Sequence, residues 1–152
     1  MSACRRRSER AGRRPLRTAG LALAALLALA GPGRAEAPAR VVSINLCTDQ
    51  LALMLAAPGQ LVSVSRLAHD PRSSAMAEAA AALPANSTLA EDVFLHRPDL
   101  VLAGTFTSRA TVSMLRRLGV DVVELAPATS LDDVSDRLRA VGGALGREAQ
   151  AE

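Results

Sequence analysis

Residues 97–125 read RPDLVLAGTFTSRATVSMLRRLGVDVVEL, a pattern from which the class of fold can be predicted. It contains two apolar runs, residues 100–103 and 120–125, each typical of a strand that is buried on both faces. The segment between the two runs places apolar residues on one helix face, namely Val112, Leu115 and Leu118. Gly119 follows at the position where a helix commonly ends. A strand, a helix and a strand in this order predict a right-handed crossover between two parallel strands.

The same alternation continues toward both ends of the chain. Residues 41–44 and 61–65 are two further candidate strands, and helices are expected at residues 51–55, 75–83 and 89–96. A longer helix is expected from five apolar residues at spacings of three and four, which are Leu131, Val134, Leu138, Val141 and Leu145. Ser130 and Asp133 match a capping box at its start. We therefore predict an α/β fold, a Rossmann-like lobe with a mainly parallel four-stranded sheet flanked by helices. Because Trp and Tyr are absent, its core must be mainly aliphatic.

The first 30 residues have the pattern of a secretory signal peptide. A basic segment precedes a short apolar run, residues 19–30, which is too short to span a bilayer. Cleavage is expected after Ala30, with a rival site after Ala37, and the pair Arg13-Arg14 leaves open whether export follows the general or the twin-arginine route. Residues 1–30 hold seven of the 18 basic and one of the 15 acidic residues, so the remainder carries 11 basic and 14 acidic residues, a formal net charge of −3. An acidic mature chain argues against nucleic acid as a partner.

Candidate ligand-binding positions follow from the predicted sheet, because ligands bind at the carboxyl ends of parallel strands. This rule selects four loops, which are residues 45–49, 66–70, 104–109 and 126–129. The loop 104–109 offers a glycine, three hydroxyl side chains and Phe106. Ser108 in this loop is equally well suited to cap the helix that follows.

A small exported enzyme is the alternative function. Cys47 would be its nucleophile with His69 as base, although a lone Cys at a strand end is more often a small buried apolar residue. A metal ion held by His69, Asp70 and His96 is the other variant, but their spacing matches no common ligand motif. We therefore predict no catalytic residue, no metal site and no cofactor.

Four segments, in this order and spacing, resemble one family. They are RVVSINLCTDQL at residues 40–51, VSVSRLAHDP at 62–71, RPDLVLAGT at 97–105 and LRRLGVDVVE at 115–124. They are similar to the substrate-binding proteins of ABC importers for ferric siderophores, haem and cobalamin. The resemblance runs from about residue 40 to residue 146.

The resemblance implies a protein with two lobes joined by one long helix, of which this chain supplies the N-terminal lobe. The parts would be a signal peptide (1–30), a flexible lead-in (31–39), the binding lobe (40–146) and the start of the linking helix (147–152). It also implies a monomeric periplasmic protein whose partners are a small metal-chelate ligand and an ABC permease in the inner membrane. A free-standing lobe that acts as an interaction module is a further alternative.

The resemblance also assigns residues. The loops that line the ligand cleft in relatives correspond here to Cys47, Thr48, Arg66, Thr105, Phe106 and Arg109. Glu91 corresponds to the glutamate that docks onto permease arginines, although a carboxylate at a helix start is also favoured by the helix dipole. Arg66 and Arg109 indicate an anionic ligand, such as a carboxylate-rich siderophore or a haem propionate.

Overall fold

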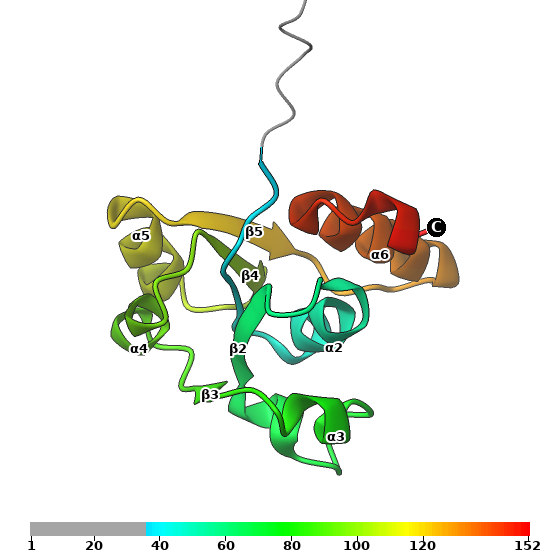
Figure 1. Cartoon of the computed structure of the whole chain (residues 1–152), viewed down its shortest axis with the longest axis horizontal. Helices are drawn as coiled ribbons and strands as arrows, with labels where there is room; N and C mark the ends of the chain where they lie inside the picture. The colour runs from blue at the N-terminus through cyan, green and yellow to red at the C-terminus, as the bar shows by residue number, and fades with distance from the viewer. Residues whose placement is uncertain (1–35) are drawn as a thin grey trace, which may run out of the picture. The chain divides into compact units, whose positions relative to one another are not determined.

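The computed structural model describes residues 36–152, so the predicted leader at residues 1–30 lies outside the described residues. In chain order the elements are β1 (Val41–Ser43), α2 (Leu46–Leu55), β2 (Leu61–Ser65), η1 (Arg66–His69), α3 (Ala77–Ala80), β3 (Ala85–Asn86), α4 (Ala90–Leu95), β4 (Leu100–Gly104), α5 (Arg109–Arg117), β5 (Asp121–Leu125), α6 (Leu131–Leu145) and η2 (Glu148–Gln150). Strands and helices alternate along this segment (Figure 1). None of the helices within it combines the length and the hydrophobicity that a membrane span requires.

The strands form one parallel sheet in the order β3-β2-β1-β4-β5. Strand β4 pairs with β5 along its whole length, from Leu100 opposite Asp121 to Gly104 opposite Leu125. The predicted α/β class and parallel sheet are confirmed, but the prediction of four strands is wrong. The fifth strand, β3, has only two residues and pairs with the end of β2.

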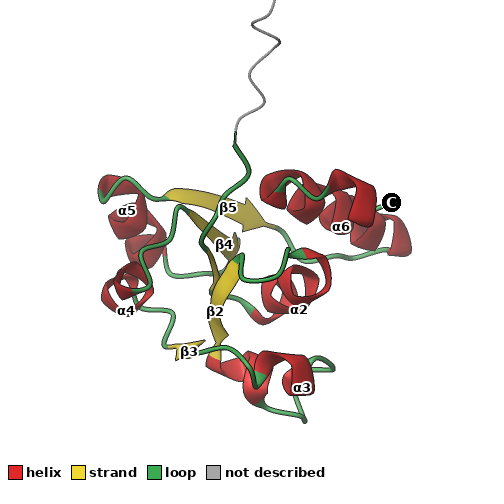
Figure 2. Cartoon of the chain, viewed as in Figure 1, coloured by secondary structure: helices red, strands yellow, loops and turns green. Residues whose placement is uncertain are grey.

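Helices cover both faces of the sheet, as the alternating side chains of β4 require. Leu102 belongs to a buried cluster with residues of α2 and α6, including Ala52, Leu55, Val141 and Leu145. The neighbouring Val101 points to the other face and packs in a cluster with residues of α4 and α5, including Val93 and Leu115. Figure 2 shows α4 and α5 on one side of the strands, with α2 and α6 on the other. Residues 36–152 therefore form a three-layer α/β/α sandwich.

The capping box predicted at the start of α6 is present, and a glycine ends the helix. Ser130 accepts a hydrogen bond from the Asp133 backbone N–H, and the Asp133 carboxylate accepts one from the Ser130 N–H, which completes the capping box. Gly146 ends the helix with φ of 67°, and Gly119 follows α5 with φ of 82°. Both are left-handed conformations that glycine adopts without a steric penalty.

The helix predicted from the apolar spacing is present as α6, but its apolar face is buried only in its second half. Val141 and Leu145 are fully buried, whereas Leu131 is 87% exposed and Val134 is 43% exposed. Val134 lies in the helical segment that lines a cavity, so the first turns of α6 adjoin open space while the last turns pack on the sheet.

The strand order reverses between β1 and β4, which are adjacent in the sheet although their paired positions, such as Val41 and Leu100, are 59 residues apart in the sequence. After β1 the chain turns to one face of the sheet, where α2 packs, and after β4 it turns to the other face, where α5 packs. A crevice opens at the carboxyl ends of two such strands, and this is the usual ligand position in open α/β sheets.

Candidate ligand-binding site

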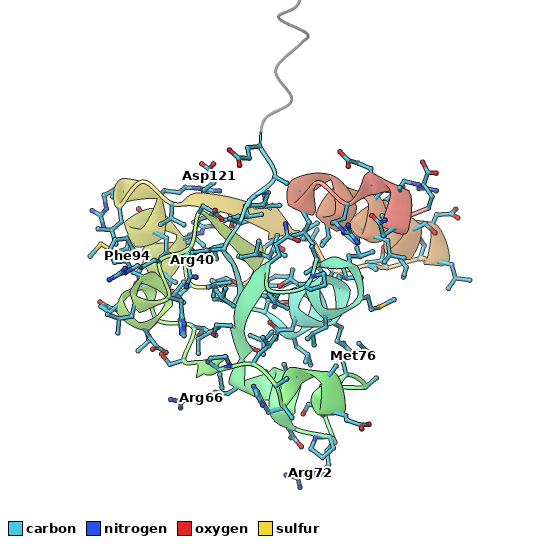
Figure 3. All side chains as sticks on the ribbon, viewed as in Figure 1. Arg40, Arg66, Arg72, Met76, Phe94 and Asp121 are labelled. Carbon is cyan, nitrogen blue, oxygen red and sulfur yellow. The ribbon has the colours of Figure 1, made fainter. Side chains whose placement is uncertain are left out.

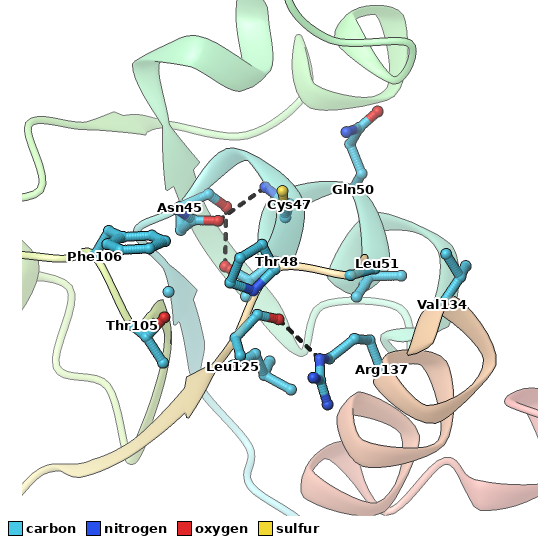
Figure 4. Close-up of a pocket in the computed structure, with 14 residues that line it drawn as sticks. Asn45, Cys47, Thr48, Gln50, Leu51, Thr105, Phe106, Leu125, Val134 and Arg137 are labelled. Carbon is cyan, nitrogen blue, oxygen red and sulfur yellow. Dashed lines mark hydrogen bonds between the residues drawn. The ribbon is translucent and has the colours of Figure 1, made fainter. Parts of the chain in front are cut away.

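A cavity of about 440 Å³ lies at this switch point (Figure 4). The loops after β1, β4 and β5 surround it together with one side of α2 and of α6. The side chains and backbone that line it are those of Asn45, Cys47, Thr48, Gln50, Leu51, Gly104, Thr105, Phe106, Leu125, Ala126, Pro127, Ala128, Val134 and Arg137. Most of these groups are apolar or uncharged, so the cavity suits a ligand with an apolar body.

The wall after β1 is built around Asn45, the N-cap of α2. Its side-chain Oδ1 accepts a hydrogen bond from the Cys47 backbone N–H at 3.0 Å, which fixes the orientation of the amide. Its Nδ2 lies over Gly104, where a Cβ would come within 2.8 Å of it. A side chain at position 104 would therefore have to displace the Asn45 amide. The Cys47 thiol beside this cap is free and exposed.

Thr48 contributes to the same wall but is 1% exposed. Its hydroxyl forms hydrogen bonds with Ser43 Oγ at 2.7 Å and with the Asn45 carbonyl at 2.9 Å. These bonds join β1 to the first turn of α2. Thr48 thus holds the wall in place with its hydroxyl, which is already engaged within the fold.

The loop after β4 forms the opposite side. The Thr105 backbone N–H donates to the Leu125 carbonyl at 3.0 Å, which keeps this loop beside the end of β5. Phe106 is 87% exposed and lines the cavity with its ring. Ser108 accepts from the Thr111 N–H at 3.5 Å as the N-cap of α5, so the structure places this serine as a cap.

Arg137 is a cavity residue that sequence reasoning missed. It is half-buried on α6, and its Nε donates to the Ala126 carbonyl at 2.8 Å. Within the described segment, it is the one charged residue among those that line the cavity. Its position could have been predicted from the sequence, because Arg137 lies one turn after Val134 on the helix that follows the candidate ligand loop 126–129.

The two arginines predicted for the site do not line this cavity. Arg66 is exposed on η1, after β2, and projects outward near β3 (Figure 3). Arg109 is the first residue of α5 and lines a separate shallow hollow with Arg116, Arg117 and Glu124. The structure thus brings together four of the six predicted residues, namely Cys47, Thr48, Thr105 and Phe106. It leaves Arg66 and Arg109 outside.

A buried polar network lies beneath α2. The Asp49 carboxylate is 0% exposed and accepts hydrogen bonds from the Ser65 N–H at 3.2 Å and from the Ser65 hydroxyl. Burial raises the pKa of Asp49 above its ordinary value of 3.8, while hydrogen bonds from Ser43 and Ser65 and the nearby His69 act in the opposite direction. This network ties the start of α2 to the end of β2.

The residues of the alternative enzyme are not assembled into one site. Cys47 lines the cavity, but His69 does not, and the buried His69 Nε2 has no hydrogen-bond partner among residues 36–152. His96 ends α4, on the other sheet face from α2. Between residues 36 and 152, no group of three or more His, Cys, Asp or Glu side chains is placed to hold a metal ion.

The predicted docking residue, Glu91, lies apart from the cavity. It is exposed in the first turn of α4. Its neighbour Asp92 accepts hydrogen bonds from the Ser87 N–H at 2.7 Å and from the Ser87 hydroxyl at 2.8 Å. Glu91 is therefore the carboxylate of this turn that faces solvent.

Solved structures with this fold span more than one ligand class. A protein of Staphylococcus epidermidis, described as a possible iron-binding, periplasmic solute-binding protein, is 21% identical with a TM-score of 0.65, over 76% of this chain and 45% of its own. A periplasmic heme-binding protein of Pseudomonas aeruginosa is 24% identical with a TM-score of 0.63, over 75% of this chain and 40% of its own. The periplasmic vitamin B12 binding protein of Vibrio cholerae is 19% identical with a TM-score of 0.60. The match covers 75% of this chain and 44% of that protein.

These likenesses concern the fold, and the chain spans less than half the length of each of the three structures. No protein of curated function matches the sequence. The family model for the periplasmic binding proteins matches residues 41–152, which covers every strand and helix of the described segment. The chain therefore belongs to the periplasmic binding protein family.

Proposed function

We propose that this chain is the N-terminal lobe of the solute-binding component of an ABC importer. It captures an iron-siderophore, haem or cobalamin-type ligand in the periplasm and delivers it to the permease of the inner membrane. The observation that supports this most directly is the cavity of about 440 Å³ at the switch point of the sheet, in a member of a family of binding proteins. The iron, heme and vitamin B12 descriptions of its structural neighbours support the range of ligands.

The proposal assigns one step to each part of the chain. Residues 1–30 direct export, and residues 40–146 form the binding lobe. Residues 147–152 begin the helix that links it to a second lobe, which would close the cavity from its open side. Cys47, Thr105 and Phe106 contact the ligand, and Thr48 supports the wall beside them. Arg66 and Arg109 lie outside this cavity and are left out of the proposed contact set.

Equilibrium titration of the purified protein with haemin, cyanocobalamin and a ferric siderophore tests ligand capture. Absorbance of each ligand and calorimetry are suitable readouts, because the chain has no Trp whose fluorescence could report binding. Saturable binding of one ligand with one-to-one stoichiometry supports the proposal. Turnover of a ligand without retention, abolished by Cys47→Ser, would support the exported enzyme instead.

The docking role of Glu91 is tested separately from binding. We predict that Glu91→Arg leaves ligand affinity and folding unchanged but abolishes uptake in whole cells, since reversing the charge opposes permease arginines. Glu78→Arg is the matched control, because Glu78 is also an exposed helical glutamate but lies on α3. Normal uptake by the Glu91→Arg variant would remove Glu91 from the docking surface.

A further inference from the structure

The cavity has a clear electrostatic character. Across the part of the chain that the structure describes, its lining contains Arg137 and no Asp or Glu. The remaining polar groups are uncharged, and Leu51, Leu125, Pro127 and Val134 provide apolar surface. A cation in a mainly apolar recess attracts an anion more strongly than it would in open solvent.

The Arg137 guanidinium is held in position before any ligand arrives. Its Nε donates to the Ala126 carbonyl at 2.8 Å, as the dashed line in Figure 4 shows. Within residues 36–152, no partner is bonded to its two terminal nitrogens. A guanidinium fixed through Nε presents these nitrogens as paired donors for a carboxylate.

The acidic residues nearest to Arg137 on α6 are engaged elsewhere. Asp133, one turn earlier, accepts hydrogen bonds from the Thr129 N–H and hydroxyl at 2.8 Å each. Asp136 pairs with Arg139 at 3.0 Å. Neither carboxylate forms an ion pair with Arg137.

A second donor lies on the facing wall. Asn45 Nδ2 has no acceptor among the described residues, because Oδ1 is turned to the Cys47 N–H by the helix cap. Asn45 belongs to the β1–α2 loop and Arg137 to α6, so the two donors come from opposite sides of the cavity (Figure 4).

We propose that Arg137 is the anion-binding residue of this cavity, and that the ligand has an apolar body carrying a carboxylate or similar anion that pairs with the guanidinium. This inference rests on the proposed function only in taking the cavity as the ligand site. It replaces Arg66 and Arg109 as the residues that recognise the charge of the ligand. Asn45 Nδ2 donates to a second acceptor atom on the same ligand.

Two fluorescent probes that differ by one anionic group test this inference. The probes are 1-anilinonaphthalene-8-sulfonate and its neutral counterpart N-phenyl-1-naphthylamine, titrated into the purified full chain. We expect Arg137→Gln to weaken binding of the sulfonate about ten- to a hundredfold, as loss of a charge-assisted hydrogen bond implies. Binding of the neutral probe should stay within about twofold, since the apolar walls are unchanged.

Arg139→Gln is the matched control. Arg139 is exposed two residues away on α6, so the variant has the same net charge as Arg137→Gln but leaves the cavity intact. It should bind both probes as the unmodified chain does. Unchanged sulfonate affinity in Arg137→Gln, or an equal loss in both arginine variants, would overturn the inference. An equal loss of both probes in Arg137→Gln would also overturn it, since that result assigns Arg137 a structural role.

Haemin and its dimethyl ester extend the test to a metal chelate. The inference is supported if the unmodified chain binds haemin more tightly than the ester and Arg137→Gln binds both equally. It is contradicted for this ligand if Arg137→Gln binds haemin, and also the ester, as tightly as the unmodified chain does. The two proposals fail in distinguishable ways. Absence of binding of every chelate refutes the proposed function, whereas the naphthyl probes still measure the anion preference of the cavity when no chelate binds.

Discussion

Gly104 lies where β4 ends and the cavity begins, and the Asn45 side chain occupies the space that a Cβ at this position would need. A Cβ there would lie 2.8 Å from Asn45 Nδ2 and 2.9 Å from Asn45 Cγ. We predict that Gly104→Ala displaces the Asn45 side chain, costs about 1 kcal/mol through loss of the α2 cap, and weakens ligand binding. Denaturation by urea, followed by circular dichroism, measures the loss of stability.

Gly143→Ala provides the comparison for this prediction. Gly143 is exposed on α6, and a Cβ there meets nothing within 4 Å. The alanine should therefore stabilise the helix by about 0.5–1 kcal/mol. If both glycine variants change stability in the same direction, steric conflict with Asn45 is not what position 104 avoids.

Asp49 gives a residue-scale prediction about pH. Burial raises its pKa in the folded state above 3.8, so the folded protein binds this proton more readily than the unfolded chain does. The contribution of Asp49 to stability therefore increases as the pH falls from above the folded pKa toward 3.8.

Asp49→Asn removes this titration. The free energy of unfolding of the unmodified chain, minus that of the variant, should be larger near pH 4 than at pH 7. Urea denaturation at both pH values measures it. A difference that does not change with pH would mean that Asp49 is not the group responsible.

The sequence predicted the cavity residues in loops better than it predicted which residues on helices point into the cavity. Cys47, Thr105 and Phe106 follow β1 and β4 directly, so the strand-end rule was enough to find them. Arg66 and Arg109 also follow strands, but η1 and α5 carry them away from the cavity. Where a side chain at the start of a helix points depends on how that helix packs, which spacing along the chain does not reveal.

At the scale of elements, the start of α6 depends on Asp133. Hydrogen bonds from the Thr129 backbone, the Thr129 hydroxyl and Ser130 lower the pKa of Asp133 below 3.8. The stability that these bonds contribute is fully present above pH 3.8 and is lost as the pH falls through the lower folded pKa.

Asp133→Asn should therefore destabilise the protein at pH 7, and the difference should shrink near pH 2. Unfolding curves in urea at both pH values measure the change. Asp132→Asn is the control, since it removes the same charge from the same helix turn while keeping the capping box. Equal effects of both variants would assign the stabilisation to the helix dipole alone.

Among the elements, those with long apolar runs were predictable and the short ones were not. The runs in residues 100–103 and 120–125 correspond to β4 and β5. Strand β3 was missed because it consists of Ala85 and Asn86 after a proline, with no β-branched residue to indicate it. The apolar spacing predicted α6 itself, but not that Leu131 would remain exposed or that Val134 would line a cavity.

At the scale of the whole molecule, two hydrophobic clusters share one sheet, and β4 contributes to both. Val101 and Leu102 are fully buried neighbours on opposite faces of this strand. Strand β4 lies inside the sheet, between β1 and β5, and belongs to both clusters. Loss of the sheet would therefore remove the packing surface of both clusters at once. The described segment should therefore unfold in one cooperative transition.

Alanine at either position tests this coupling. Leu102→Ala should cost about 2–5 kcal/mol and Val101→Ala less, since a smaller side chain is removed. Each variant should shift the whole unfolding curve to lower urea concentration while keeping a single transition. Far-UV circular dichroism follows the backbone, and hydrogen exchange at amides of α5 and α6 reports on the two layers separately. If Leu102→Ala released α6 while α5 kept its full protection, the two faces of the sheet would be independently stable, and the sheet would not act as their common support.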